Sequence, residues 1–125
     1  MNIIKKKSPK NKLVKNKKIN KKNIKSNKKI VYKKIKSISK KSNIKLLKYG
    51  VSKVGDKKFY VTFNKNNKIY NVNFGNKNYQ DYTAHKDINR RSRYLARAKG
   101  ITDKYGNKTY KKITSPNFWS VNVLW

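Results

Sequence analysis

Residues 46–75 carry a regular alternation of apolar and polar side chains. Three runs share this period of two, which is typical of strands with one apolar face. Gly55-Asp56 lies between the first two runs, residues 64–68 (Asn-Lys-Asn-Asn-Lys) lie between the last two, and Gly75 follows. The pattern predicts a two- or three-stranded antiparallel hairpin or meander. Its apolar positions are Leu47, Tyr49 and Val51, then Phe59, Val61 and Phe63, then Tyr70, Val72 and Phe74.

A sheet this small needs a cover over its apolar face. A helix over residues 83–99, ended by Gly100, is the predicted cover. At 100° per residue its apolar side chains form one stripe, made of Ala84, Ile88, Leu95 and Ala98. Arg91 also falls in this stripe, where Asp87 is expected to pair with it. The opposite side is predicted to be a cationic ridge that is free for a ligand, made of Lys86, Arg90, Arg93 and Arg97.

The C-terminal residues form the most apolar segment of the chain. Residues 105–108 (Tyr-Gly-Asn-Lys) suit a turn, and Ser115-Pro116 suits a helix N-cap followed by proline at the first helical position. The segment either completes the core over the sheet or mediates self-association with another subunit. Its large side chains are Phe118, Trp119, Val121, Val123, Leu124 and Trp125.

Residues 1–45 differ sharply in composition from the rest. They contain 19 lysines and no acidic residue, and their isoleucines keep neither a helical nor a strand period for long. They are therefore predicted to be a disordered basic arm when free. The fold class expected for the chain is α+β, with this arm at 1–45 followed by one small domain at 46–125.

The net charge of +32 makes a polyanion the expected partner. Lysines and arginines exchange places with the counterions condensed on nucleic acid, so binding is expected to be strong, largely sequence-nonspecific and salt-dependent. An anionic membrane surface would also attract the chain. No apolar stretch suits a signal peptide or a membrane span, so secretion is not expected. The candidate nucleic-acid contacts in the arm are Lys5, Lys6, Lys7, Lys17, Lys18, Lys21, Lys22, Lys28, Lys29, Lys33, Lys34, Lys40 and Lys41.

Candidate catalytic groups are few. His85 is the sole histidine, and Asp81 and Asp87 are the acids nearest to it; these three could in principle hold a divalent metal. The chain has four aspartates and no glutamate, which is a poor supply for a two-metal site. Asp81 also suits a helix N-cap, and His85 a structural role. No catalytic residue, metal or cofactor is predicted, and the chain is expected not to be an enzyme.

Four segments carry a resemblance to a known group of proteins. They are Tyr70-Asn71-Val72-Asn73-Phe74-Gly75, the stretch from Asp81 to Asp87, the stretch from Arg90 to Arg97, and Ser115-Pro116-Asn117-Phe118-Trp119-Ser120 with Leu124-Trp125. Together they resemble a family of small basic, largely uncharacterised proteins of large nucleocytoplasmic DNA viruses, the giant viruses among them. The resemblance implies a viral origin, and the charge then suggests a place in the genome-containing core of a virion and in the infected cell.

Three functions fit these observations. The first is a viral protein that neutralises and condenses or packages double-stranded DNA. The second is an RNA-binding or ribosome-associated basic protein, whose tyrosines would stack on unpaired bases. The third is a minor virion structural protein whose arm threads between acidic surfaces.

Overall fold

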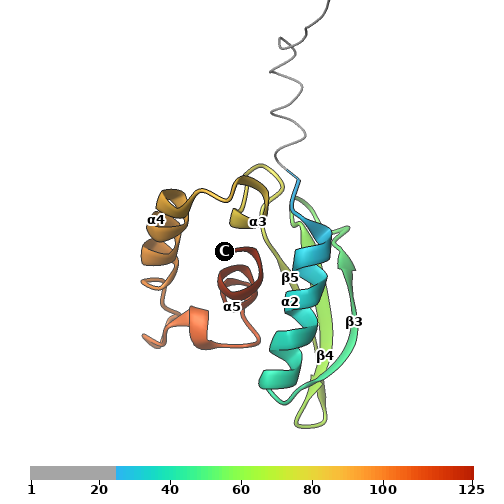
Figure 1. The fold of residues 1–125 in the computed structure, drawn as a ribbon. Coiled ribbons are helices and arrows are strands. Elements are labelled where there is room, and N and C mark those ends of the chain that lie inside the picture. Colours follow the sequence, from blue (N-terminus) through green and yellow to red (C-terminus); the bar gives the residue numbers. More distant parts are fainter. Residues whose placement is uncertain (1–24) are drawn as a thin grey trace, which may run out of the picture.

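The computed structural model describes residues 25–125, which form an α+β fold. A three-stranded antiparallel sheet lies on one side of the molecule and helices lie against one of its faces (Figure 1). In chain order the elements are α2 (Lys28–Lys41), β3 (Lys45–Val51), β4 (Phe59–Lys65), β5 (Lys68–Phe74), α3 (Tyr82–His85), α4 (Ile88–Ala98), η1 (Thr109–Lys111), α5 (Pro116–Trp119) and η2 (Ser120–Leu124).

The predicted meander is confirmed. The strands follow the order β3-β4-β5, and Val61 in the central strand pairs with Tyr49 on one side and Val72 on the other. Asn66 and Asn67 both have positive φ, 54° and 65°, which matches the two-residue type I′ turn that joins tightly paired strands. A register shift between Leu46 and Lys48 interrupts the alternation in β3, so Leu47 is exposed.

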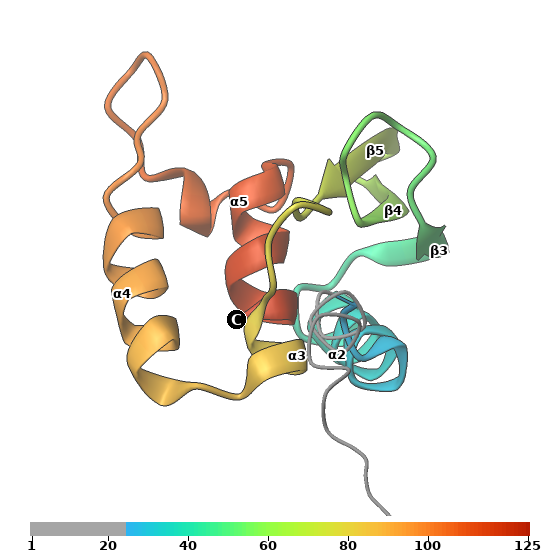
Figure 2. The same cartoon turned by 90° about the horizontal axis from the view of Figure 1, so that it is seen from above.

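The predicted cover is wrong in part. The apolar side chains of β4 and β5 pack against α2 and the C-terminal helices, whereas α4 lies on the far side of the C-terminal helices (Figure 1). The view from above shows the same order, with α5 between α4 and the sheet (Figure 2). The buried core consists of Val31, Ile35, Phe59, Val61, Phe63, Val72, Phe74, Trp119, Val123 and Leu124.

The helix predicted over residues 83–99 is two helices. Lys86 adopts a left-handed conformation with φ 57°, which ends α3 after one turn. Asp87 then begins α4, because its carboxylate accepts hydrogen bonds from the backbone N–H groups of Asn89 and Arg90. Asp81 caps α3 in the same way, so its predicted capping role is confirmed. Helix α4 ends at Ala98, two residues before Gly100, as expected.

The buried side chains of the C-terminal segment belong to the core. Of the two alternatives for these side chains, completion of the core and self-association, the first is therefore confirmed. Ser115 caps α5 and Pro116 occupies the first turn, as predicted. Trp119 is fully buried, and its indole N–H donates to the Ile113 carbonyl at 2.7 Å. Gly75 follows β5 with φ 85°, and a side chain there would come within 2.9 Å of Leu124. Glycine thus lets the chain leave the sheet directly beside the C-terminal helix.

The predicted extent of the disordered arm is wrong at its C-terminal end. Residues 28–41 form helix α2, and Lys45 already belongs to β3. Val31 and Ile35, four residues apart, point into the core. The burial of these two side chains stabilises helix α2 against the repulsion between its lysines. Residues 1–24 lie outside the described part of the chain.

Candidate nucleic-acid interface

Helix α2 presents lysines on its solvent side. Its buried side is formed by Val31, Ile35 and Ser39, and the Ser39 hydroxyl donates to the Ile35 carbonyl at 2.8 Å. The spacing of four, three and four residues brings four exposed lysines onto one line along the helix. We call these residues the α2 lysine ridge: Lys29, Lys33, Lys36 and Lys40.

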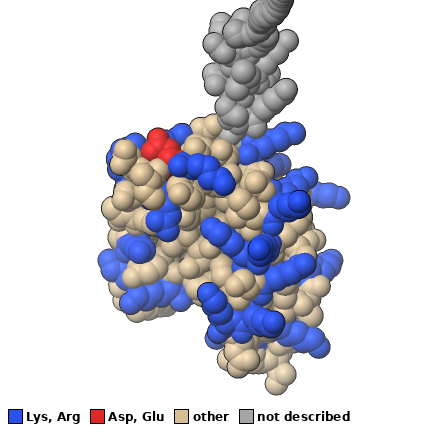
Figure 3. Space-filling view, in the orientation of Figure 1, with Lys and Arg blue, Asp and Glu red and all other residues tan. Residues whose placement is uncertain are grey.

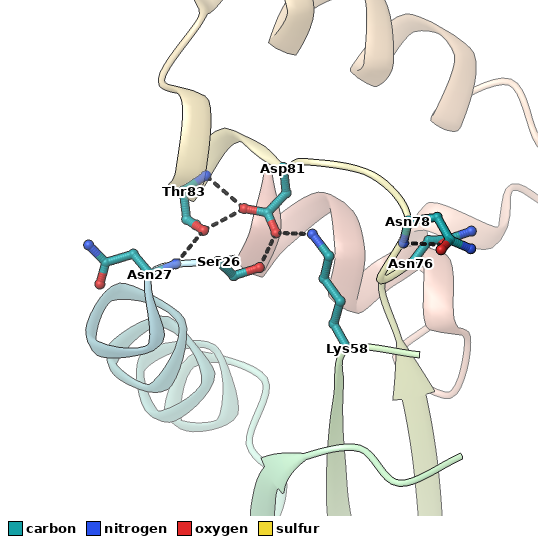
Figure 4. Close-up of polar contacts among 7 residues, drawn as sticks. All are labelled: Ser26, Asn27, Lys58, Asn76, Asn78, Asp81 and Thr83. Carbon is teal, nitrogen blue, oxygen red and sulfur yellow. Dashed lines mark hydrogen bonds and ion pairs between the residues drawn. The ribbon is translucent and has the colours of Figure 1, made fainter. Parts of the chain in front are cut away.

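A cluster of polar groups around Asp81 fixes the beginning of α2 (Figure 4). One Asp81 oxygen accepts from the Lys58 ammonium at 2.7 Å and from the Ser26 hydroxyl; the other accepts from the backbone N–H of Thr83 at 2.9 Å and from its hydroxyl. Thr83 in turn accepts from the backbone N–H of Asn27 at 3.0 Å. Asn27 is the N-cap of α2, and its side chain accepts from the Ile30 N–H. The cluster therefore joins the residues directly before α2 and before β4 to the first turn of α3 at one buried carboxylate.

Carboxylates neutralise few of the cations in the described residues. Two ion pairs are present there, Lys58 with Asp81 and Lys112 with Asp103. Neither pair involves a lysine of α2. Lysine and arginine side chains cover much of the face seen in Figure 3, and acidic atoms show in one small area at its upper left. The ridge charges are thus left for an external anion.

Lys34 lies on the side of α2 that faces the segment around α3. Burial lowers its pKa, and the nearby positive charges of Arg91 and Lys86 lower it further, against the opposing effect of Asp81. Cations from different parts of the chain therefore crowd together here. An anion bound at this place would relieve their mutual repulsion.

A cleft of about 580 Å³ opens beside the beginning of α2. Lys58 on its wall already pairs with Asp81, but the other three lysines have no carboxylate within ion-pair distance among the described residues. Val51 and Phe59 add apolar surface. The cleft extends the cationic surface of α2 toward the strands. It is lined by Lys25, Ser26, Lys28, Val51, Lys58, Phe59 and Lys77.

The arginine ridge predicted on the helix of residues 83–99 is only partly assembled. Lys86 lies between α3 and α4 and is exposed. Arg90 is half-buried, and its guanidinium donates to the Gln80 side chain at 2.9 Å, so it is less available than expected. Arg93 and Arg97 are exposed on α4, as the prediction requires.

Arg91 is structural, as predicted, but its partner differs. Its Nε donates to the Trp125 backbone oxygen at 2.6 Å, and its guanidinium lies 5.4 Å from the centre of the Tyr82 ring. Asp87 is occupied instead with the cap of α4. The Trp125 ring stacks on Tyr94 at 4.1 Å, which completes the attachment of α4 to the C-terminal segment.

The sequence-predicted arm contacts fall into two groups. Lys28, Lys29, Lys33, Lys40 and Lys41 are exposed on α2, and Lys34 is half-buried. The others, from Lys5 to Lys22, lie outside the described residues. Sequence reasoning missed Lys36, which lies on the ridge with its ammonium 6.0 Å from the centre of the Tyr49 ring. The spacing of Val31, Ile35 and Ile38 by four and three residues was the signal that could have revealed the helix.

His85, Asp81 and Asp87 do not converge on a metal site. Within residues 25–125, no three histidine, cysteine or acidic side chains are grouped as metal ligands. Asp81 is held by Ser26, Lys58 and Thr83, whereas His85 Nδ1 accepts from the Asp87 backbone N–H at 2.9 Å. His85 Nε2 is buried without a hydrogen-bond partner. Burial, followed by the charge of Arg90, lowers the pKa of His85.

Residues 48–98 match a family of unknown function (DUF5754). The matched stretch runs from β3 to the end of α4 and leaves out α2 and the C-terminal helices. No curated protein matches the chain. No solved structure matches it. None of the helices in the described residues has the length and apolar character needed to cross a membrane.

Proposed function

We propose that this protein binds double-stranded DNA largely without sequence specificity and condenses it. The observation that carries the proposal is the α2 lysine ridge, four exposed lysines on a helix anchored in the core, with no carboxylate paired to it among the described residues. From Lys29 to Lys40 the ridge spans about 16 Å, over which one strand of a duplex presents roughly five phosphates. The ridge thus matches a run of backbone phosphates in length and in charge.

Condensation requires contacts to more than one duplex segment. Helix α4, on which Arg93 and Arg97 are exposed, lies on the opposite side of the C-terminal helices from α2 (Figure 1). The lysines of residues 1–24 supply a further cationic segment. A chain with separated cationic surfaces can bridge two duplexes and also reduce the repulsion between them. The resemblance to proteins of large DNA viruses makes the genome-containing core of a virion the place where we propose this activity occurs.

The test compares two full-length variants that lose the same charge. In one, the ridge residues Lys29, Lys33, Lys36 and Lys40 are replaced by Gln; in the control, Gln replaces the exposed and scattered Lys53, Lys68, Lys104 and Lys108. Each lost phosphate contact lowers the magnitude of the slope of log affinity against log salt by roughly 0.9. The slope of the ridge variant, which loses four lysines, should therefore be smaller in magnitude by between about 3 and 4. The control should lose clearly less. Equal losses would show that net charge alone matters and would contradict a positioned ridge.

Compaction is measured on the same proteins. Full-length protein should convert long duplex DNA into compact particles in electron micrographs at low salt, and high salt should reverse this. Removing residues 1–24 should weaken duplex binding by orders of magnitude while α2 and the core remain. An extended coat on the DNA at charge-neutralising ratios would rule out condensation. A tenfold preference for single-stranded RNA over duplex DNA would favour the RNA-binding alternative.

A further inference from the structure

The sheet has a second face that no described element covers. Helices α2 and α5 lie on the side of Phe59, Val61 and Phe63, and the ribbon views show nothing against the other side (Figures 1 and 2). Because side chains alternate along a strand, the open face carries the intervening residues. The cross-strand register arranges them in three rows: Gly50, Tyr60 and Asn73 in one, Lys48, Thr62 and Asn71 in the next, and Lys45, Asn64 and Ile69 in the third.

Tyr60 lies at the middle of its row with an unusual neighbour. A methyl group added to Gly50 would lie 3.3 Å from Tyr60 Cε1 and 3.7 Å from Cζ, so the ring leans into the space that a side chain at Gly50 would take. A glycine inside a strand often marks such a close approach. Among the described residues, no other ring and no cation is in contact with the Tyr60 ring. The ring is half-buried, so part of it faces solvent.

The polar groups beside Tyr60 are oriented as donors. The Thr62 hydroxyl donates to the Asn71 amide oxygen at 2.6 Å, and the Ser52 hydroxyl donates to the Asn73 amide oxygen at 2.7 Å. With the oxygens occupied, the two amide nitrogens offer N–H groups that have no acceptor among the described residues. Lys48 adds an ammonium group. No acidic residue occurs in β3, β4 or β5.

We infer that the open face binds a single-stranded segment of nucleic acid, with one unpaired base stacked on Tyr60. The amides of Asn71 and Asn73 donate to acceptors of that base or its sugar, and Lys48 contacts a phosphate. The charge complementarity favours an anion, and a tyrosine ring can stack on a base only where the base is unpaired. Duplex DNA hides its base faces, so this surface is distinct in location and ligand from the α2 lysine ridge.

The experiment uses full-length protein with 15-residue oligomers of dT and of rU and a 15-bp duplex, at a salt concentration high enough to weaken phosphate contacts. Tyr60→Leu removes the aromatic ring but keeps apolar bulk, whereas Tyr60→Phe keeps the ring. Tyr105→Leu is the control, because Tyr105 is an exposed tyrosine in the loop between α4 and η1. Tyr60→Leu should weaken single-strand binding about tenfold with an unchanged salt slope. Tyr60→Phe and Tyr105→Leu should stay within about twofold of the unaltered protein.

Photocrosslinking of unaltered protein to bromouracil-substituted DNA and RNA oligomers supplies a readout that needs no variant. Crosslinked peptides should include Tyr60, and whichever oligomer gives the higher yield identifies the natural form. Crosslinks confined to other segments would overturn the inference, as would a loss for Tyr60→Phe equal to that for Tyr60→Leu. Duplex affinity should not change in either Tyr60 variant. If the Tyr60 variants bind single strands normally, the proposed duplex binding by the α2 lysine ridge is not affected. If the ridge variant binds duplex DNA normally, the inference about Tyr60 is not affected.

Discussion

Helices α2 and α4 both carry cations toward solvent, but they are held in different ways. Val31 and Ile35 of α2 are fully buried against the sheet, and the Asp81 cluster holds its beginning. Helix α4 buries Ala98 alone, leaves Ile88 59% exposed, and is attached mainly through Tyr94 and Arg91 to Trp125. One helix is part of the core, and the other is bound to the core's edge.

This difference decides what each helix can offer a ligand. Because α2 is anchored by apolar burial, none of the four ridge lysines is used in an ion pair within the described residues, and Lys36 makes only a contact with the Tyr49 ring. In α4 two of the four arginines are used to hold the structure, Arg91 to Trp125 and Arg90 to Gln80. A cationic helix therefore presents more of its charge when uncharged side chains do the anchoring.

Removing the Asp81 carboxylate should give the largest effect. Asp81→Ala leaves the buried Lys58 ammonium without its partner, which typically costs about 3–5 kcal/mol. Lys112→Ala is the control, because it breaks an exposed ion pair, which contributes little, and leaves the hydrogen bonds from the Tyr105 and Asn107 N–H groups to Asp103 in place. Urea unfolding of both variants measures the difference. Similar losses in the two would mean that Asp81 does not hold α2.

Truncating the anchor of α2 should come next. Ile35→Ala should lower the free energy of unfolding by about 2–5 kcal/mol, because it leaves a cavity in the core. Ile88→Ala removes the same atoms from an exposed position on α4 and should change it by less than about 0.5 kcal/mol. Thermal or urea unfolding is the measurement. An equal cost at both positions would erase the distinction between the two helices.

Arg91 should matter for stability more than its neighbour does. Arg91→Gln removes a charged donor from the Trp125 backbone oxygen, which should cost about 1.5–3 kcal/mol. Arg93→Gln, at an exposed position two residues later, should be nearly silent. If Arg91→Gln is silent as well, the hydrogen bond from Arg91 to Trp125 does not contribute to stability.

The two helices can also be compared as ligand contacts. Replacing Lys33 and Lys40 by Gln should lower the salt slope of duplex binding by about 2, at roughly 0.9 per contact. Replacing Arg93 and Arg97 by Gln tests whether α4 contributes an equal share in the full-length chain. We expect a smaller change, because two isolated arginines do not follow a line of phosphates. A larger change for the arginine pair would make α4 the main interface.

The smallest expected effect concerns pH and the joint between α3 and α4. The folded-state pKa of His85 is lowered, so the unfolded chain binds its proton more readily. Stability should therefore fall as pH drops below the ordinary histidine value of about 6.5. His85→Gln should abolish the loss of stability between pH 7 and 5, because the aspartates titrate at lower pH. Unchanged dependence between pH 7 and 5 in that variant would refute the assignment.

Local chemistry determined much of this fold from the sequence alone. Alternation predicted β4 and β5, positive-φ residues suited the hairpin turn, and Ser115-Pro116 predicted the start of α5. Each of these features depends on residues that are close together in the chain, so the local sequence is sufficient to predict it. Asp87 was expected to pair with Arg91, but the helix break at Lys86 makes it the N-cap of α4 instead, a role that the sequence did not suggest.

Tertiary structure decided which segments share the core and hence which cations are free. Lysine-rich composition predicted an arm to residue 45, yet burial of Val31 and Ile35 against distant strands makes residues 28–41 a helix. Likewise, tertiary structure places Arg91 within hydrogen-bonding distance of the Trp125 backbone oxygen and places Tyr60 beside Gly50 on the open face of the sheet. These outcomes depend on long-range packing, whose free energy outweighs local propensity and charge repulsion only once the partner surfaces exist.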